Sequence, residues 1–226
     1  MKCHETGRSM IEMLGVIAII GILTVGGIAG YSKAMEKWRI NKTANQISYI
    51  VARLRNLYQS QYDFHGLDSS TSTTQRMIDK TQAFPQEMGK AGDYSNPFAG
   101  KVTVKVSGRD YADKKDDNGE YISRSDNRAF VLTYTMVPRE ACMAIATLYW
   151  GSGSVGGLVA LGINYEQGSK KFDEITTLKC VKSAIQATPQ KLGSMIICEG
   201  DGVMSPTDAS IGCSSEGNNT LQFKFY

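Results

Sequence analysis

RSMIEMLGVIAIIGILTVGGIAGY, residues 8–31, is the stretch that decides the fold of this chain. The 19 residues from Met13 to Tyr31 carry no charge. At 1.5 Å per residue, a helix of this length is about enough to cross the roughly 30 Å core of a bilayer. A secretory signal peptide would have an apolar core of about 7–15 residues, followed by a small-residue cleavage site. This run is longer and no such site closes it, so it predicts a membrane-spanning helix.

Two features of the first 12 residues are unusual for an ordinary membrane anchor. A short polar leader, MKCHETG, ends in Gly7 immediately before the apolar run, and Glu12 lies one turn inside the run. A carboxylate in a membrane helix costs about 2.5–3.5 kcal/mol at the helix centre, so it usually has a partner. Cleavage after Gly7 would leave a new ammonium group on Arg8. That amine would lie at the positive end of its own helix macrodipole, and it could pair with Glu12 of a neighbouring copy in a bundle of apolar helices.

The segment GRSMIEMLGVIAIIGIL, residues 7–23, resembles the class III signal of type IV pilins and pseudopilins. In that family a prepilin peptidase cuts after the glycine, methylates the new terminus and leaves a glutamate fifth in the mature chain. Gly7 and Glu12 match those two positions. One departure is Arg8, because the first mature residue in the family is usually Phe, Met or Leu, and an intrahelical Arg8–Glu12 pair would compete with the intersubunit pair. The alternative is a single-pass anchor whose glutamate lies near the headgroups.

Composition and cysteine placement limit what the rest of the chain can be. A net charge of +3 without any Lys/Arg block gives no reason to predict nucleic-acid binding. Cys3 lies in the leader, whereas Cys142, Cys180, Cys198 and Cys213 are an even set in the C-terminal half. Outside the cytoplasm, four such cysteines predict two disulfides. A metal site is the competing reading, but no C-x-x-C or histidine pairing supports it, and no metal or cofactor is expected.

The apolar helix is predicted to continue beyond Tyr31 to about Phe64, because residues 32–62 contain no proline or glycine. Apolar residues from Ile47 to Tyr58 recur at spacings of three and four, which predicts one buried helical face. The expected organisation has four parts: a cleaved leader at 1–7, a membrane or polymerisation half at 8–31, an amphipathic half at 32–64, and a globular head at 65–226.

The head is expected to be α+β, with mainly antiparallel strands laid against the amphipathic half of the helix. Alternation at 102–106 and the run AFVLTYTMV at 129–137 predict strands, and Asn118-Gly119 predicts a hairpin turn. Pro138 and the Ser205-Pro206 pair are typical of helix starts. The full set of further expected elements is a helix at 74–82, a helix at 138–149, a strand at 158–163, a helix at 174–187, a strand at 194–198, a helix at 206–213 and a strand at 221–226.

The head also resembles a family, the PilS-like type IVb pilins. The matching pieces are VPREAC at 137–142, SPTDASIGC at 205–213, and a strand that closes the chain. This resemblance implies the type IV pilin fold and favours the disulfides Cys142–Cys213 and Cys180–Cys198 among the three possible pairings. The seven-residue leader departs from the family, because type IVb leaders are usually longer.

Two motifs resemble ligand-binding loops but lack features that such sites require. GSGSVG at 151–156 matches G-x-G-x-x-G, but a helix is expected before it and a strand after it, the reverse of a dinucleotide site. DKKDDNGE at 113–120 approaches a calcium loop, yet Lys114 and Ser125 fall at the first and last ligand positions. His65 stands alone, so no catalytic set is expected and the chain is not expected to be an enzyme.

The resemblance implies a structural subunit that waits in the bacterial inner membrane, is cut by prepilin peptidase and joins an extracellular pilus. The partners implied are other copies of the chain and the membrane assembly machinery, and the filament would serve adhesion, motility, DNA uptake or conjugation. The alternatives are a minor pilin, a pseudopilin in a periplasmic type II secretion filament, and a membrane-tethered adhesin or binding module. A membrane-anchored enzyme is the weakest reading.

Overall fold

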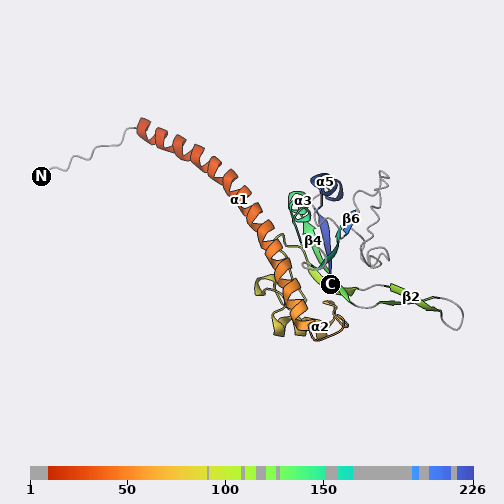
Figure 1. The fold of residues 1–226 in the computed structure, drawn as a ribbon. Coiled ribbons are helices and arrows are strands. Elements are labelled where there is room, and N and C mark those ends of the chain that lie inside the picture. The colour runs from red at the N-terminus through yellow and green to blue at the C-terminus, as the bar shows by residue number, and fades with distance from the viewer. Residues whose placement is uncertain are drawn as a thin grey trace. The chain divides into compact units, whose positions relative to one another are not determined.

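The computed structural model of this chain describes residues 10–90, 92–107, 110–115, 121–125, 128–150, 157–164, 195–198, 204–214 and 218–226 (Figure 1). For 110–115, 121–125 and 195–198 the description covers the backbone. The chain divides into two compact units, Met1–Arg39 and Ile40–Tyr226, which we describe separately.

Helix α1 (Met10–Tyr58) contributes 49 residues and belongs to both units. Within the first unit its large apolar side chains are exposed. Within the second unit its buried residues recur every three or four positions, as expected for a helix that packs one face against a core. Those buried residues are Thr43, Gln46, Ile47, Ile50, Val51 and Leu54.

The predicted end of this helix near Phe64 is wrong, because α1 ends at Tyr58. The amide of Gln61 donates to the carbonyl oxygen of Tyr58 at 2.8 Å, and the chain then turns back. Phe64 is buried, and its ring centroid lies 5.1 Å from that of Tyr58 and 4.9 Å from that of Phe130. Six more helical residues would carry Phe64 about 9 Å along the axis from Tyr58. Burying this ring therefore requires the helix to stop.

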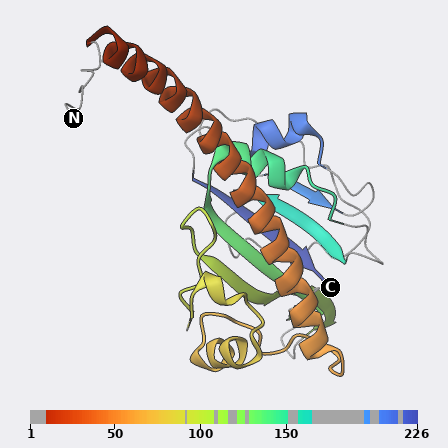
Figure 2. The same ribbon diagram turned by 90° about the vertical axis from the view of Figure 1, so that its left-hand side faces the viewer.

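A five-stranded antiparallel sheet forms the centre of the second unit, in the order β1-β4-β7-β5-β6. β7 is last in the chain but lies in the middle of the sheet. The second half of α1 crosses one face of this sheet (Figure 2). The strands are β1 (Val102–Ser107), β4 (Ala129–Val137), β5 (Leu158–Ile163), β6 (Met195–Cys198) and β7 (Asn219–Phe225).

Alternation along the central strand explains which side of the sheet forms the core. Leu221, Phe223 and Phe225 are buried and belong to the same hydrophobic cluster as the α1 residues. Phe223 packs edge-on against Trp150, with ring centroids 5.1 Å apart. Just after β7, the backbone oxygen of Tyr226 accepts a hydrogen bond from the guanidinium Nε of Arg55, on α1, at 2.7 Å. Burial of this guanidinium lowers the pKa of Arg55.

A second sheet contains β2 (Asp110–Lys115) and β3 (Tyr121–Ser125), which pair antiparallel. This pairing agrees with a hairpin in the polar stretch. The predicted turn at Asn118-Gly119 lies outside the described residues.

Short helices complete the second unit. α2 (Ser72–Thr81) starts two residues earlier than predicted, because the hydroxyl of Thr71 accepts a hydrogen bond from the amide of Thr74 and caps the helix. A 3-10 turn, η1 (Gln86–Met88), follows. The remaining helices are α3 (Arg139–Ala146) and α5 (Pro206–Gly212).

The predicted start of α5 agrees with the structure, whereas the predicted end of α3 is wrong. Ser205 caps α5 by accepting from the amide of Asp208 at 3.1 Å, and Pro206 follows as the first helical residue. α3 ends at Ala146 rather than near Tyr149, because Trp150 packs against the core and its indole Nε1 donates back to the carbonyl oxygen of Ile145 at 3.1 Å. The predicted helix at 174–187 lies outside the described residues.

Candidate functional site

The first functional feature is the apolar surface of α1 within the first unit. Its large side chains are exposed; Ile17 is 64% and Leu23 is 68% accessible. Within the described residues, α1 is also the one helix that is long and apolar enough to cross a membrane, judged by length and composition. In water, fully burying such a side chain contributes about 1.5–3 kcal/mol. Exposing a dozen of them to water is therefore strongly unfavourable. They are Met10, Ile11, Met13, Leu14, Val16, Ile17, Ile19, Ile20, Ile22, Leu23, Val25 and Ile28.

The hydroxyl groups of Thr24 and Ser32 on this helix are satisfied within the helix itself. The hydroxyl of Thr24 donates to the carbonyl oxygen of Ile20 at 2.7 Å, and that of Ser32 donates to the carbonyl oxygen of Ile28 at 3.0 Å. Such back-bonding hides a hydroxyl from an apolar environment. These side chains therefore do not oppose burial of the helix.

Glycines provide a second observation on the same surface. A Cβ atom built on Gly15, Gly21, Gly26, Gly27 or Gly30 would meet no other atom within 4 Å. No described residue therefore requires glycine at these positions, although each glycine weakens a helix by about 1 kcal/mol relative to alanine. Small residues in apolar helices allow another helix backbone to approach closely. These five positions therefore leave room for another helix backbone to approach closely.

Glu12 is the charged group of this apolar surface. It lies in the first turn of α1 and its side chain is exposed, with no ion pair to another described residue. Its position near the helix N-terminus is favourable for a negative charge. Gly7 and Arg8, the predicted processing residues, lie outside the described residues. The partner proposed for Glu12 from the sequence is therefore not placed by the structure.

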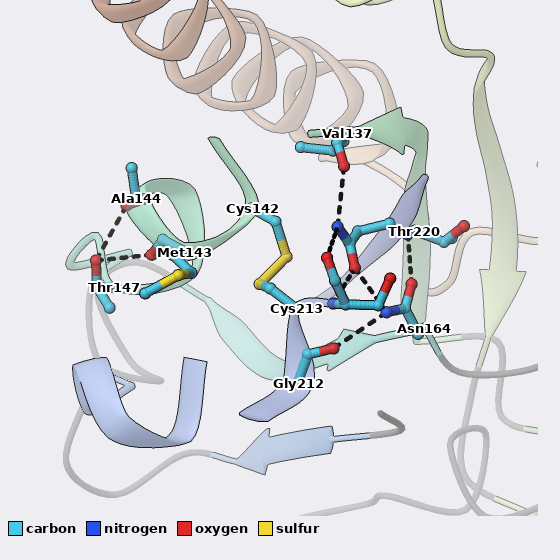
Figure 3. Close-up of a disulfide and its surroundings, with 11 residues drawn as sticks. Val137, Cys142, Met143, Ala144, Thr147, Asn164, Gly212, Cys213 and Thr220 are labelled. Atoms are coloured by element: carbon cyan, nitrogen blue, oxygen red, sulfur yellow. Dashed lines mark hydrogen bonds between the residues drawn. A yellow bond between two sulfur atoms is a disulfide. The ribbon is translucent and has the colours of Figure 1, made fainter. Parts of the chain in front are cut away.

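The second functional feature is the disulfide that links two helices of the head. Cys142 on α3 and Cys213 after α5 are bonded, with their Cα atoms 6.0 Å apart, and both are buried (Figure 3). This is the pair that the resemblance to PilS-like pilins favours. For the other expected pair, Cys180 lies outside the described residues, and Cys198 is described as part of β6 by its backbone.

The described residues contain no group of three or more His, Cys, Asp or Glu side chains arranged to hold a metal ion. His65 is exposed, and its backbone amide donates to the carboxylate of Asp63 at 3.0 Å. Two segments considered in the sequence analysis fall outside the described residues. They are the glycine-rich motif at 151–156 and residues 116–120 of the segment that resembles a calcium loop.

Sequence reasoning missed a set of asparagines that organise the loops of the head. Asn96 accepts from the amides of Phe98 and Gly100 and donates to the carbonyl oxygen of Thr135 at 2.8 Å. Asn164 and Asn219 form a similar network beside the disulfide. In sequence each resembles an ordinary turn residue. The available signal for Asn96 was the Asn-Pro turn at 96–97, and it did not identify a buried side chain.

The family model described as PilS N terminal matches residues 37–225. The major structural subunit of bundle-forming pilus from Escherichia coli O127:H6 (strain E2348/69 / EPEC) is 28% identical over 162 residues, 69% of this chain and 70% of that protein. The protein of the same description from Escherichia coli O111:H- gives the same values. The crystal structure of TcpA, a type IV pilin from Vibrio cholerae El Tor biotype, aligns with a TM-score of 0.49 and 14% identity, covering 84% of this chain and 99% of that one.

Proposed function

The chain belongs to the PilS family of type IVb pilins, and on that premise we propose that it is cleaved after Gly7 and assembles into a helical pilus. As a pilin it is a structural subunit and not an enzyme. In this proposal, residues 8–31 form the membrane-embedded and later polymerising half of the helix. The head outside this segment forms the surface of the fibre.

The observation that carries this proposal is the unsatisfied surface of α1 within the first unit. Among the described residues, a dozen large apolar side chains of this segment are exposed, and Cβ atoms built on its five glycines would meet nothing within 4 Å beyond the helix's own backbone. In the membrane, lipid covers them, and on extraction into a filament the same helices from other copies would cover them. Burial of the dozen side chains from water corresponds to roughly 20–35 kcal/mol. A subunit pulled out of lipid would therefore be held firmly by its neighbours.

Glu12 would give that packing its register. Apolar rods can slide past one another with little change in energy, whereas a buried carboxylate without a cation is strongly unfavourable. The amine created on Arg8 by cleavage is the cation that we propose for this role, in a neighbouring subunit. Prepilin peptidase is therefore a required partner, together with the assembly machinery of the inner membrane.

The disulfide supports placement of the head outside the cytoplasm, where such bonds form and persist. We propose that the subunit first resides in the bacterial inner membrane with its head on the periplasmic side. After assembly the head would be exposed on an extracellular pilus. The curated relative is a major structural subunit of bundle-forming pilus, which favours a major pilin over a minor one.

Two measurements test the proposal directly. Mass spectrometry of the mature protein should find a chain that begins at Arg8, and recovery of chains that begin at Met1 would contradict the processing step. Glu12→Gln should lower filament yield at least tenfold in electron micrographs while leaving the folding of the head unchanged. Glu140→Gln is the matched control, because it removes the same charge from the first turn of α3. Equal yields for the two variants would argue against a role for Glu12.

The second candidate is a minor pilin or a type II secretion pseudopilin. It shares the exposed helix, so the site does not separate it from a major pilin. Filament abundance does: long, plentiful fibres containing this chain support the major subunit, whereas short or scarce ones support the alternative. A membrane-tethered adhesin would keep its leader and form no fibres.

A further inference from the structure

Two asparagines hold the chain on both sides of Cys213. The side chain of Asn219, at the start of β7, is fully buried. Its Oδ1 accepts from the amide of Ser214 at 2.7 Å, and its Nδ2 donates to the carbonyl oxygen of Ser214 at 3.3 Å. The residue that follows Cys213 is therefore fixed through both of its backbone polar groups.

Asn164, just after β5, fixes the residue before Cys213. Its Nδ2 donates to the carbonyl oxygen of Gly212 at 3.0 Å and to Oδ1 of Asn219 at 2.8 Å. Its own Oδ1 accepts from the amide of Thr220 at 2.8 Å. Figure 3 shows Asn164 between Gly212 and Thr220, close to the disulfide. We refer to Asn164 and Asn219 together as the asparagine clamp.

The clamp also reaches the strand that leads to Cys142. The Nδ2 of Asn219 donates to the carbonyl oxygen of Val137 at 3.1 Å, at the end of β4. The next residue, Pro138, accepts a hydrogen bond from the amide of Cys142 at 2.8 Å. One buried side chain thus connects the neighbourhoods of both cysteines, and none of these hydrogen bonds needs the disulfide to be present.

Burial of the sulfurs restricts when the disulfide can form. Cys142 is 0% and Cys213 is 1% exposed. An oxidant must contact a thiolate to react with it, so it cannot reach these sulfurs once the core is closed. The partner of each cysteine is therefore chosen in a partly folded chain, by whatever contacts already exist there.

Chain entropy alone would choose a different partner. Cys198 precedes Cys213 by 15 residues, whereas Cys142 and Cys213 are 71 residues apart. With a loop-closure probability that falls as the three-halves power of loop length, the shorter loop is favoured about tenfold. Formation of the Cys142–Cys213 bond therefore needs local structure that offsets this factor.

We propose that the asparagine clamp guides thiol oxidation in this head by presenting Cys213 to Cys142 before the disulfide exists. The bond from Asn219 to Ser214 spans five residues, so closing it costs little entropy. Pairing of β7 with β4 then brings Val137, and with it Cys142, to the same place. Asn164 and Asn219 are positioning residues, since they act on the backbone around the cysteines and not on the sulfurs.

The chemistry is ordinary exchange with a disulfide oxidant of the glutathione type. The thiolate of Cys142 attacks one sulfur of the oxidant, breaks its disulfide and releases the first thiolate. The thiolate of Cys213 then attacks the mixed disulfide at the Cys142 sulfur and releases the second. The two protein thiols lose two electrons and two protons in total, and the oxidant becomes two thiols.

The test is oxidative refolding of the reduced full-length chain in detergent micelles with oxidised glutathione. Peptide mapping without reduction then gives the fraction of each cysteine pairing. Asn219→Ala and Asn164→Ala should lower the Cys142–Cys213 fraction at least threefold and raise the Cys198–Cys213 fraction, toward the distribution formed in denaturant. Asn96→Ala is the matched control, because it removes a buried asparagine with a comparable network elsewhere in the head.

A second measurement separates guidance from general loss of stability. In a Cys3→Ser/Cys180→Ser/Cys198→Ser background, where mispairing is impossible, both clamp variants should form the Cys142–Cys213 bond several-fold more slowly than Asn96→Ala. If all three variants pair and oxidise alike, the clamp contributes only stability and the proposal is wrong. The same conclusion follows if Asn219→Ala and Asn164→Ala retain the parent pairing.

Discussion

The two halves of α1 contain similar apolar side chains, but those of the first half are exposed and those of the second half are buried. Between Met10 and Ile28 the apolar residues occur on all sides of the helix and are exposed, whereas Ile47, Ile50 and Leu54 lie on one side and are completely buried. The second half is amphipathic because its partner, the sheet, occupies one side. The first half is apolar all round, which is typical of a helix surrounded by apolar material.

This difference shows that the function of an apolar residue depends on whether its own chain covers it. Substitutions in the covered half should act on the stability of the head. Substitutions in the uncovered half should act on association and leave the head unchanged. The following predictions test that separation.

The largest expected effect is that of Leu54→Ala compared with Leu23→Ala, the same chemical change at two places on one helix. Leu54 is 0% and Leu23 is 68% exposed. Removing a buried leucine side chain costs about 2–5 kcal/mol, because it leaves a cavity as well as losing burial. Leu54→Ala should therefore lower the free energy of unfolding by about 3 kcal/mol, whereas Leu23→Ala should change it by less than about 0.5 kcal/mol.

Urea titration in micelles measures the free energy of unfolding of the two variants. Trp150 reports the head, since its indole Nε1 donates to the carbonyl oxygen of Ile145 at 3.1 Å and its ring packs on Phe223. The experiment is done in a Trp38→Phe background, so that the signal comes from Trp150. The order of the two variants should be reversed for filament yield. Leu23→Ala should lower the yield although its head is intact. A similar loss of stability from both variants would contradict the separation.

Local patterns explain why part of this fold could be predicted from the sequence. The uncharged run at 13–31, the alternation at 102–106 and the run at 129–137 each carry a period that a single segment defines. The structure places α1, β1 and β4 there. Ser205-Pro206 likewise acts within one turn, and α5 begins at Pro206 as that pair predicts.

The features that the sequence did not predict correctly, or did not predict at all, depend on contacts between distant segments. The end of α1 is set by Phe64 packing against Phe130, 66 residues further along the chain, and no local signal marks it. The central position of β7 likewise follows from its pairing with both β4 and β5. In the candidate site, Glu12 stood out because a charge inside an apolar run is visible locally. Asn164 and Asn219 did not stand out, because their partners come from other strands.

An intermediate effect is expected for Gly21→Ala. An added Cβ meets nothing within 4 Å, so nothing in the chain opposes it. Alanine is favoured over glycine in a helix interior by about 1 kcal/mol. The isolated subunit should therefore show slower amide exchange around residue 21 in micelles. Filament yield should fall, because the methyl group would occupy space that a neighbouring helix needs.

Gly100→Ala is the counterpart in the covered region. A Cβ on Gly100 would overlap the backbone carbonyl of Thr135, so this substitution should destabilise the head without any filament being present. Thermal unfolding of the isolated subunit distinguishes the two glycines. If Gly21→Ala left filament yield at the parent level, close helix packing at that position would be excluded.

The smallest effect should come from a carboxylate of the head, whose partners lie within the chain, in contrast to Glu12. Burial acts to raise the pKa of Asp68, but hydrogen bonds from Ser70 and the charge of Lys105 outweigh it, and the pKa is lowered overall. The ionised form therefore stabilises the fold above the unfolded pKa of about 4, and that contribution is lost as the pH falls through the lower folded value.

Asp68→Asn should remove this part of the acid dependence, measured as unfolding midpoints in urea between pH 5 and pH 2. Because the site is largely solvated, added salt should screen Lys105 and shrink the difference between parent and variant. An acid dependence that is identical in the two proteins would show that Asp68 stabilises the turn through geometry and not through its charge.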